Sequence, residues 1–356
     1  MNNTHILKSL FFALTVMLLS CSGDSNDDSG GGSDVTSITI SKQFNNDIYV
    51  GDAIFFDVKT NNNDFVTTSA NITVNGVSIN GSNYTPQTAG VIDVVATYNG
   101  LTSNTLQISV LELPTKFTKN VLIEDYTGTW CGWCPRVAYG VEQVEAATDK
   151  SITVAIHRGS PSTSSSTHDP YNFNATALEN IINLEGYPTA MLDRTTVWAY
   201  PEPSNVNQVV NIANEEADLG LALAPVLSNN NISLDVNVKF GTAVANPKLV
   251  VYVLENDLFY DQVNYTSYYG GGDILANFEH DNVLRATLTD LMGDQIPSAE
   301  VVADNVYSKN ITVSVPGNVT NTSKMTIVAF VVNGNNNKVY NARVATFGET
   351  QTIEEL

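Results

Sequence analysis

Cysteine occurs at only three positions in this chain of 356 residues, and this restricts how the chain can be held together. Cys131 and Cys134 form one Cys-x-x-Cys pair, whereas Cys21 lies far upstream at the end of a short apolar run. A chain with a single such pair is not a disulfide scaffold, so its stability must come from packed hydrophobic cores. The pair itself is therefore predicted to be a redox centre or the remnant of one.

The first 34 residues have the features of a targeting segment and a tether, which are left out of fold reasoning. Leu10–Leu19 is apolar but shorter than the roughly 20 residues that a membrane-spanning helix needs. Residues 1–20 are predicted to be a lipoprotein signal peptide, because Ser20-Cys21 resembles a lipobox and Cys21 would then carry the lipid. An ordinary secretory signal is the alternative. Residues 21–34 are acidic and rich in Gly and Ser, which predicts a flexible tether.

The composition is acidic and moderately apolar. There are 16 Lys and Arg residues against 37 Asp and Glu residues, for a formal net charge of -21, and the basic residues form no cluster. Such a surface repels nucleic acid, so a nucleic-acid partner is excluded and the acidity is interpreted as an aid to solubility. With 43% hydrophobic residues at this length, two or three cores are predicted.

Residues 35–113 show the period-two alternation that is typical of β-strands. Apolar residues recur at every second position in short runs, and turn-forming segments such as Asn61-Asn62-Asn63 and Asn99-Gly100 separate these runs. Short strands at this spacing predict an immunoglobulin-like β-sandwich. Its residues suggest no chemistry, so a spacer or stalk is the predicted role.

The periodicity changes in residues 114–218. A fully apolar run at Val121-Leu122-Ile123 is typical of a sheet covered on both faces. Val137, Val141 and Val144 follow at helical spacing, and further strand and helix patterns alternate after them. This order of elements predicts a central α/β domain.

Residues 219–356 return to alternation. Ile232 to Phe240 is the clearest example, with an apolar residue at every second position, and Asn333 to Asn337 has the composition of a hairpin loop. A C-terminal β-sandwich is therefore predicted for this segment. The whole chain is then multidomain, with a sandwich on each side of the α/β domain.

The Cys-x-x-Cys pair is placed where thiol chemistry can be activated. A thiol reacts as a thiolate, and a helix N-terminus lowers the thiol pKa from about 8.5 through its unsatisfied N–H groups and its dipole. Cys131 is predicted at the start of the helix and Cys134 one turn further in, which suits an exposed attacking sulfur and a more buried resolving sulfur. Gly132-Trp133 between them supplies no cation, which favours a reducing or isomerising poise.

Around the pair the sequence resembles the thioredoxin superfamily. Trp130-Cys131-Gly132-Trp133-Cys134 is similar to the active-site pattern of that superfamily, with Asp125 six residues before Cys131. Gly186-Tyr187-Pro188-Thr189 is similar to its cis-proline loop. The resemblance implies a thioredoxin-like central domain, with Cys131 as nucleophile, Cys134 as resolving thiol and Asp125 as proton acceptor. It also implies that an extended peptide would be held by Trp130, Gly132, Trp133, Tyr187 and Pro188.

A Cys-x-x-Cys pair is also half of a zinc site, which needs two further Cys or His ligands. His157, His168 and His280 are scattered along the sequence and are interpreted as surface or packing residues. We therefore expect no metal site. We also expect no cofactor besides the redox-active cysteine pair.

A narrower resemblance covers about Leu113 to Phe347. The segments Val121–Pro135, Asp169-Pro170-Tyr171 and His280–Arg285 are similar to the twenty-eight-kilodalton outer-membrane-protein-related lipoproteins of the Bacteroidetes. This resemblance implies a cell-envelope, outer membrane lipoprotein that is periplasmic or surface-exposed and contacts the membrane through its lipid anchor only. It defines no reaction, and adhesive roles have been suggested for some members.

Two functions are compatible with these features. The first is a thiol–disulfide oxidoreductase of the reductase or isomerase type, whose partners are extracytoplasmic proteins that carry disulfides or a thiol electron donor. The second is a surface-displayed binding or adhesion protein whose Cys131–Cys134 pair is a structural disulfide. A tyrosine-rich segment, Tyr260 to Tyr269 followed by Gly270-Gly271-Gly272, is a candidate contact loop, although packing at a strand edge is the simpler interpretation.

Overall fold

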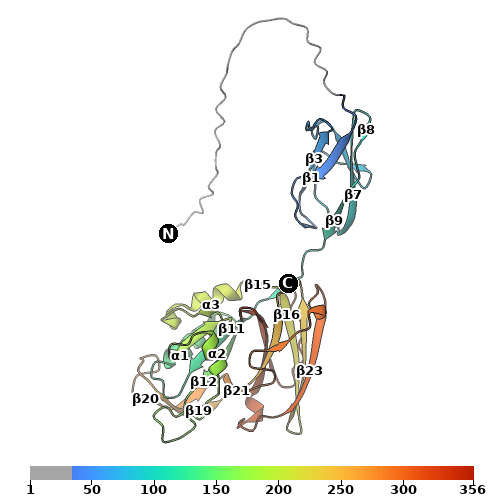
Figure 1. The fold of residues 1–356 in the computed structure, drawn as a ribbon. Helices are drawn as coiled ribbons and strands as arrows, with labels where there is room; N and C mark the ends of the chain where they lie inside the picture. Colours follow the sequence, from blue (N-terminus) through green and yellow to red (C-terminus); the bar gives the residue numbers. More distant parts are fainter. Residues whose placement is uncertain (1–33) are drawn as a thin grey trace, which may run out of the picture. The chain divides into compact units, whose positions relative to one another are not determined.

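The computed structural model describes residues 34–356 (Figure 1). The signal peptide expected at residues 1–20, the lipidation expected at Cys21 and the tether up to residue 33 lie outside the described residues. The chain forms two compact units, one ending at Glu112 and one spanning Leu113–Leu356. Strands account for 44% of the structure and helices for 11%, so both units are built mainly from sheets.

The first unit consists of two sheets that share one hydrophobic core. One sheet has the strand order β1-β3-β6, and the other has the order β2-β9-β7-β4-β5, with β8 paired to β7. Ile54, Phe56 and Val58 of β3 are buried between the sheets, because successive side chains of a strand point to opposite faces. The strands are β1 (Ile38–Lys42), β2 (Ile48–Tyr49), β3 (Ile54–Thr60), β4 (Asn71–Val74), β5 (Val77–Ser78), β6 (Asn83–Tyr84), β7 (Gly90–Tyr98), β8 (Leu101–Thr102) and β9 (Leu106–Leu111).

A mixed nine-stranded sheet organises the second unit. Its order is β14-β13-β11-β12-β21-β18-β24-β25, and β22 pairs with β18 beside this path. β11 runs parallel to β12 and antiparallel to β13, and β12 joins β21 through the parallel pair Ala155 and Val283. Its strands are β11 (Val121–Thr127), β12 (Ser151–His157), β13 (Thr189–Leu192), β14 (Thr196–Val197), β18 (Pro247–Glu255), β21 (Val283–Thr287), β22 (Asp294–Gln295), β24 (Met325–Asn333) and β25 (Val339–Thr346).

A three-stranded sheet packs on part of the large sheet. It has the order β16-β17-β23, and its strands are β16 (Leu219–Ser228), β17 (Asn231–Phe240) and β23 (Val306–Ser314). Its apolar side chains, such as Leu221 and Val236, share a core with Val251 of β18 and Ile327 of β24. Two further strand pairs belong to the second unit: β10 (Phe117–Thr118) with β15 (Glu216–Ala217), and β19 (Leu258–Val263) with β20 (Ile274–His280).

Helices α1 and α3 cover one face of the large sheet near β11. α1 (Pro135–Ala147) buries Val137, Val141 and Val144 against Val121 and Ile123 of β11, and α3 (Val206–Ala213) adds to the same core. Since residues along a strand alternate between faces, Leu122 of β11 points the other way. There it shares a core with α2 (Thr176–Ile181). Three short 3-10 helices complete the unit, at Glu202–Ser204, Ser298–Glu300 and Thr322–Lys324.

The fold class expected from the sequence is wrong. A separate central α/β thioredoxin-like domain would need a sheet of its own and more than 11% helix. Instead, the strands of residues 114–218 continue into one sheet with β18, β21, β24 and β25. The C-terminal β-sandwich is not a separate domain either, because this same sheet is one of its two layers. Periodicity locates strands, but it does not show which strands pair.

Buried polar contacts hold the strands of residues 114–218 to the C-terminal strands. Arg194, just after β13, binds Glu124 of β11 at 2.7 Å and donates a hydrogen bond to the Tyr252 hydroxyl of β18 at 2.9 Å. Arg194 and Glu124 both have fully buried side chains. Lys119 and Asp193 form a second buried pair at 2.7 Å. Both ion pairs lie within residues 114–218. The links to the C-terminal strands are the Tyr252 hydroxyl, which accepts from Arg194, and the Tyr340 carbonyl, which accepts from Lys119 at 3.3 Å.

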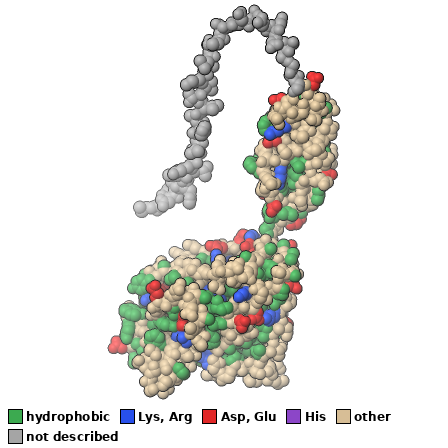
Figure 2. Space-filling view, viewed as in Figure 1, with side chains coloured by type: hydrophobic (Ala, Val, Ile, Leu, Met, Phe, Trp, Pro, Cys, Tyr) green, Lys and Arg blue, Asp and Glu red, His purple; other side chains and the backbone are tan. Residues whose placement is uncertain are grey.

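The surface carries its charge diffusely. In Figure 2 the acidic side chains of each unit are scattered over the visible face and do not gather into one patch. Such a distribution favours solubility more than a specific electrostatic docking site. Within residues 34–356, every helix is too short or too polar to cross a membrane.

Candidate functional site

The two cysteines form a disulfide at the beginning of α1. The sulfur atoms are 2.01 Å apart and the Cα atoms 5.4 Å apart. Cys134 is the residue that precedes the helix, and Pro135 occupies its first turn, where a missing N–H costs nothing. The Val137 amide donates to the Cys134 carbonyl, and the Cys134 amide donates to the Cys131 carbonyl. The pair therefore lies at the helix N-terminus, as the spacing of the apolar residues predicted.

The helix terminus supplies the main positive potential at the pair. Its unsatisfied amides and its dipole favour a negative charge on sulfur in the reduced form. Arg136 lies in the first turn, but its guanidinium pairs with the buried Glu202 carboxylate. Because this pairing offsets the charge of Arg136, the helix stabilises a thiolate with little help from side chains.

Asp125 of β11 is a buried carboxyl beside Cys134. It is 5% exposed, and its Oδ1 atom has no hydrogen-bond partner among the described residues. Burial raises its pKa to about 8, with a further rise from Glu202 and an opposing effect from Arg136. Asp125 and Cys134 line the same cavity, which has a volume of about 140 Å³. A carboxyl with this pKa can both accept and release a proton near neutral pH.

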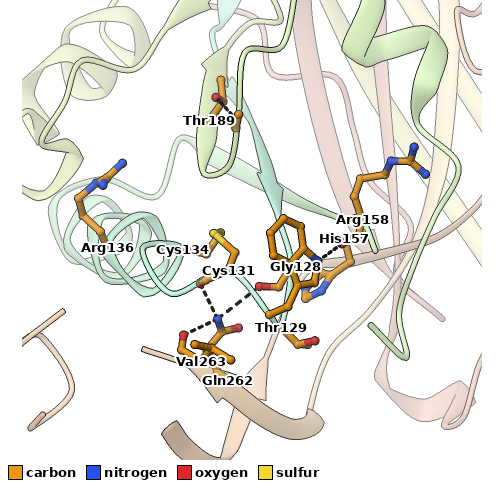
Figure 3. Close-up of a disulfide and its surroundings, with 12 residues drawn as sticks. Gly128, Thr129, Cys131, Cys134, Arg136, His157, Arg158, Thr189, Gln262 and Val263 are labelled. Atoms are coloured by element: carbon orange, nitrogen blue, oxygen red, sulfur yellow. Dashed lines mark hydrogen bonds between the residues drawn. A yellow bond between two sulfur atoms is a disulfide. The ribbon is translucent and has the colours of Figure 1, made fainter. Parts of the chain in front are cut away.

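The hairpin of β19 and β20 covers the outer side of the disulfide. Gln262, a buried side chain of β19, donates from Nε2 to the Cys131 carbonyl at 3.0 Å (Figure 3). The Val263 amide donates to the Thr129 carbonyl at 2.8 Å, and the Tyr265 amide donates to the Gly132 carbonyl at 2.6 Å. Residues 262–265 therefore attach to the Cys-x-x-Cys turn along its backbone.

Tyr265 explains why the second residue of the motif is glycine. A Cβ atom on Gly132 would lie 2.3 Å from the Tyr265 ring, which is closer than such atoms approach. The ring also packs edge-to-face on Trp133, with centroids 5.9 Å apart. Cys131 is 4% exposed and Cys134 2% exposed, so the exposed attacking sulfur expected from the sequence is buried in the disulfide form. The hairpin therefore covers Cys131 on the Gly132 side.

The residues expected to hold a peptide lie around the disulfide but not in one open groove. Trp133 is 52% exposed and lies under Tyr265. Trp130 packs edge-to-face on Tyr187 at 5.6 Å, and the Tyr187–Pro188 bond is cis, as expected for the loop before β13. The hairpin therefore contacts Gly132 and Trp133, whereas Trp130 and Tyr187 contact each other.

Two histidines that were interpreted as surface or packing residues are buried beside the pair. His157, at the end of β12, contacts Asp169 at 2.9 Å through Nδ1, and Asp169 in turn accepts the Thr129 amide at 2.9 Å. Burial alone would raise the pKa of Asp169, but its bonds to His157 and to backbone amides lower it overall. His157 thereby helps to fix the turn before the cysteines. His280 of β20 packs against the His157 ring.

These contacts were missed because they join distant parts of the sequence. Gln262, Tyr265 and His280 follow the Cys-x-x-Cys pair by more than a hundred residues. The one available signal was the tyrosine-rich segment before Gly270-Gly271-Gly272. Its packing interpretation fits the structure, since Tyr268 stacks on Tyr139 of α1 with centroids 4.8 Å apart.

One cluster of possible metal ligands occurs in the described part of the chain, and two of its members, Glu279 and Asp281, also line the cavity beside Cys134. Asp257, Glu279 and Asp281 are exposed, and their ligand atoms lie within 4.8 Å of one another. Lys324 already pairs with Asp257 and offsets part of this charge. Exposed carboxylates of this kind are common without a bound ion, so the cluster is not interpreted as a metal site.

Comparison with protein families identifies the class to which the second unit is similar. A family model described as "Outer membrane protein Omp28" matches residues 175–351, which excludes the cysteine pair. The match supports the resemblance inferred from the sequence over that range. It also supports the predicted localisation at the outer membrane of the cell envelope.

Two solved structures are similar to parts of this chain. HBP35 of Porphyromonas gingivalis is similar at 18% identity over 66% of this chain and 77% of that chain, with a TM-score of 0.50. At this identity the likeness shows the fold alone. A domain of the outer membrane lipoprotein Omp28 from Porphyromonas gingivalis matches at 18% identity over 37% of this chain and 88% of that chain, with a TM-score of 0.26. A comparison with curated protein sequences gives no significant match.

Proposed function

We propose that this outer membrane lipoprotein performs thiol–disulfide exchange at Cys131 and Cys134, in the reducing or isomerising direction, on disulfides of extracytoplasmic proteins. One observation carries the proposal. The buried carboxyl of Asp125, whose Oδ1 atom has no hydrogen-bond partner among the described residues, lines the same cavity as Cys134 and has a pKa of about 8. Burying such a group lowers stability, and perturbed carboxyls of this kind concentrate at functional sites.

In the first step the reduced Cys131 acts as the nucleophile. Its thiolate attacks one sulfur of a substrate disulfide, a mixed disulfide forms, and the other substrate sulfur leaves as a thiolate. The N-terminus of α1 favours the Cys131 thiolate, and the local arrangement fits this role because Cys131 lies three residues before Cys134, the N-cap of the helix.

In the second step Cys134 resolves the mixed disulfide. The Cys134 thiol gives its proton to the Asp125 carboxylate, and the resulting thiolate attacks the Cys131 sulfur. The Cys131–Cys134 bond forms, and the second substrate sulfur leaves and takes up a proton. The substrate disulfide has then gained two electrons from the protein dithiol. A thiol electron donor in the envelope must reduce the pair again.

The Cys131–Cys134 pair is expected to act as a reductant and not as a strong oxidant. Strong oxidants stabilise their reduced form through a cation beside the thiolate. Here the dipeptide Gly132-Trp133 carries no charge, and the nearby Arg136 is paired with Glu202. Thiolate stabilisation is therefore left to the helix, which supports a reductase or isomerase.

The second candidate is a displayed binding protein whose disulfide is structural. The observation that favours it is the burial of the pair, with Cys131 4% and Cys134 2% exposed beneath the hairpin. On this alternative the disulfide fastens the start of α1, and the exposed rings of Trp133 and Tyr265 contribute to a binding surface.

The two candidates are separated by mixing the reduced protein with 5,5′-dithiobis(2-nitrobenzoate). The proposal predicts two phases of thionitrobenzoate release, one from attack by Cys131 and one from resolution by Cys134. Cys131→Ser should abolish both phases of rapid release. Its matched control, Cys134→Ser, should keep the first phase and accumulate a stable mixed disulfide.

The reduction potential of the pair gives an independent result. A potential below about −300 mV is typical of structural disulfides. Such a potential, together with a single slow phase in the unmodified protein, would establish the structural role and exclude the oxidoreductase.

A further inference from the structure

The cavity beside Cys134 collects buried polar atoms from three strands. Asp125 Oδ1 comes from β11, Thr153 Oγ1 from β12 and His280 Nε2 from β20, and each lacks a hydrogen-bond partner within residues 34–356. Residues 125 and 127 of β11 lie on one sheet face with residues 153, 155 and 157 of the parallel strand β12, because side chains alternate along a strand. The hairpin that covers the disulfide supplies His280 and closes the cavity from the other side.

Three unpartnered polar atoms around one cavity are unusual. Buried polar groups are nearly always hydrogen-bonded, to protein or to ordered water, and each exception lowers stability. The cavity measures about 140 Å³, which is room for several water molecules at about 30 Å³ each. Polar walls and sufficient volume are the two conditions under which a protein cavity holds water.

The cavity also reaches a charged rim. Besides the groups above, its titratable lining consists of His157 and four carboxylates, Glu142, Glu145, Glu279 and Asp281. Glu142, Glu145, Glu279 and Asp281 are exposed to solvent, whereas Asp125 is buried. From outside the lining, Glu202 and Arg136 act on Asp125 with opposite signs. The cavity therefore connects a buried carboxyl to surface groups that exchange protons with bulk water.

We propose that ordered water in this cavity carries protons between Asp125 and solvent, and that Thr153 and His280 position this water. The inference rests on the proposed function, in which Asp125 receives the proton of Cys134 during resolution. Asp125 then passes that proton to the first water, and the last water releases a proton at the acidic rim. Burial lowers the pKa of His280 to about 3, with a further effect of His157, so the ring is neutral at pH 7 and can only donate and accept hydrogen bonds.

The first test measures the two phases of thionitrobenzoate release in Thr153→Val and His280→Phe. Thr153→Val replaces the hydroxyl with a methyl group of similar size, and His280→Phe keeps an aromatic ring while removing both ring nitrogens. We expect the second phase to slow at least threefold in each variant and the first phase to be unchanged. Thr326→Val is the matched control, because the Thr326 hydroxyl is also buried without a partner in the described chain but lies outside this cavity. It should leave both phases unchanged.

The second test is independent of activity and uses thermal unfolding. If the cavity were dry, Thr153→Val would remove an unsatisfied hydroxyl and raise Tm. If water binds the hydroxyl, the water loses a partner and Tm stays equal or falls, which is the expected result.

The outcomes distinguish the two proposals. A raised Tm in Thr153→Val, or a second phase that is unchanged in both cavity variants, overturns the water path while the exchange reaction stands. Absence of the second phase in the unmodified protein overturns the exchange reaction, and the proton path with it.

Discussion

Replacing Asp125 with Asn should make the stability of the second unit less dependent on pH. Asp125 is 5% exposed, and burial is the largest cause of its raised pKa of about 8. In the unfolded chain the same carboxyl has an ordinary pKa of 3.8. The folded state therefore holds the proton more tightly. The stability that protonated Asp125 contributes is fully present below about pH 4 and is lost as pH rises towards 8.

The size of the effect follows from this difference of about four pKa units. Each unit corresponds to about 1.4 kcal/mol, so wild-type stability should fall by about 1.4 kcal/mol per pH unit between pH 5 and 7 through this group. Asn has nearly the same shape and no charge. The variant should match the wild type at pH 4 and exceed its unfolding free energy by up to about 5 kcal/mol at pH 8.

Tryptophan fluorescence during urea denaturation provides the assay, since Trp130, Trp133 and Trp198 all lie in the second unit. The exposed Asp149 at the end of α1 supplies a matched Asp→Asn control that should show no such trend. A difference between variant and wild type that stays constant from pH 4 to pH 8 would refute the reasoning, because Asp125 would then ionise as it does in the unfolded chain.

Two further predictions concern the hairpin and the buried ion pair. Tyr265→Ala should raise the rate at which iodoacetamide alkylates reduced Cys131 by about two- to tenfold, because an aromatic pair contributes about 0.5–1.5 kcal/mol; an unchanged rate would show that the hairpin does not restrict access. Arg194→Met should lower the unfolding free energy by about 3–5 kcal/mol by leaving Glu124 charged and unpaired, and adding Glu124→Gln should restore much of it. Urea denaturation measures the unfolding free energy of both variants. Equal losses of unfolding free energy in the single and the double variant would contradict this prediction.

Much of the local structure could be predicted from the sequence. Val137, Val141 and Val144 form the buried face of α1, and the alternation from Ile232 to Phe240 is a strand whose apolar residues point into the core.

The pairing of strands was the part that sequence patterns could not supply. Val283 pairs with Ala155 across more than a hundred residues, and this contact joins the two halves of the large sheet. A strand's periodicity specifies its buried face but not its neighbours. The α/β domain expected at residues 114–218 and the β-sandwich expected at residues 219–356 therefore form a single compact unit.

For the candidate site, too, local features could be predicted from the sequence and long-range contacts could not. Cys131 and Cys134 were identified from the Cys-x-x-Cys motif and Asp125 from a resemblance to a known active-site pattern, and the structure brings Asp125 and Cys134 to one cavity. Gln262, Tyr265 and His280 were not identified, because their roles depend on where a distant hairpin lies. Residues that surround a motif through tertiary contacts leave no signature near it.

The ion pair of Arg194 with Glu124, together with its bond to Tyr252, also bears on how this protein can change over evolutionary time. Its three members come from segments on either side of residue 218. An exchange of the cysteine-bearing segment between relatives would carry Arg194 and Glu124 together, but Arg194 would lose its third partner unless the recipient had a hydroxyl at the position of Tyr252. We therefore expect the residue at position 252 to vary together with this segment.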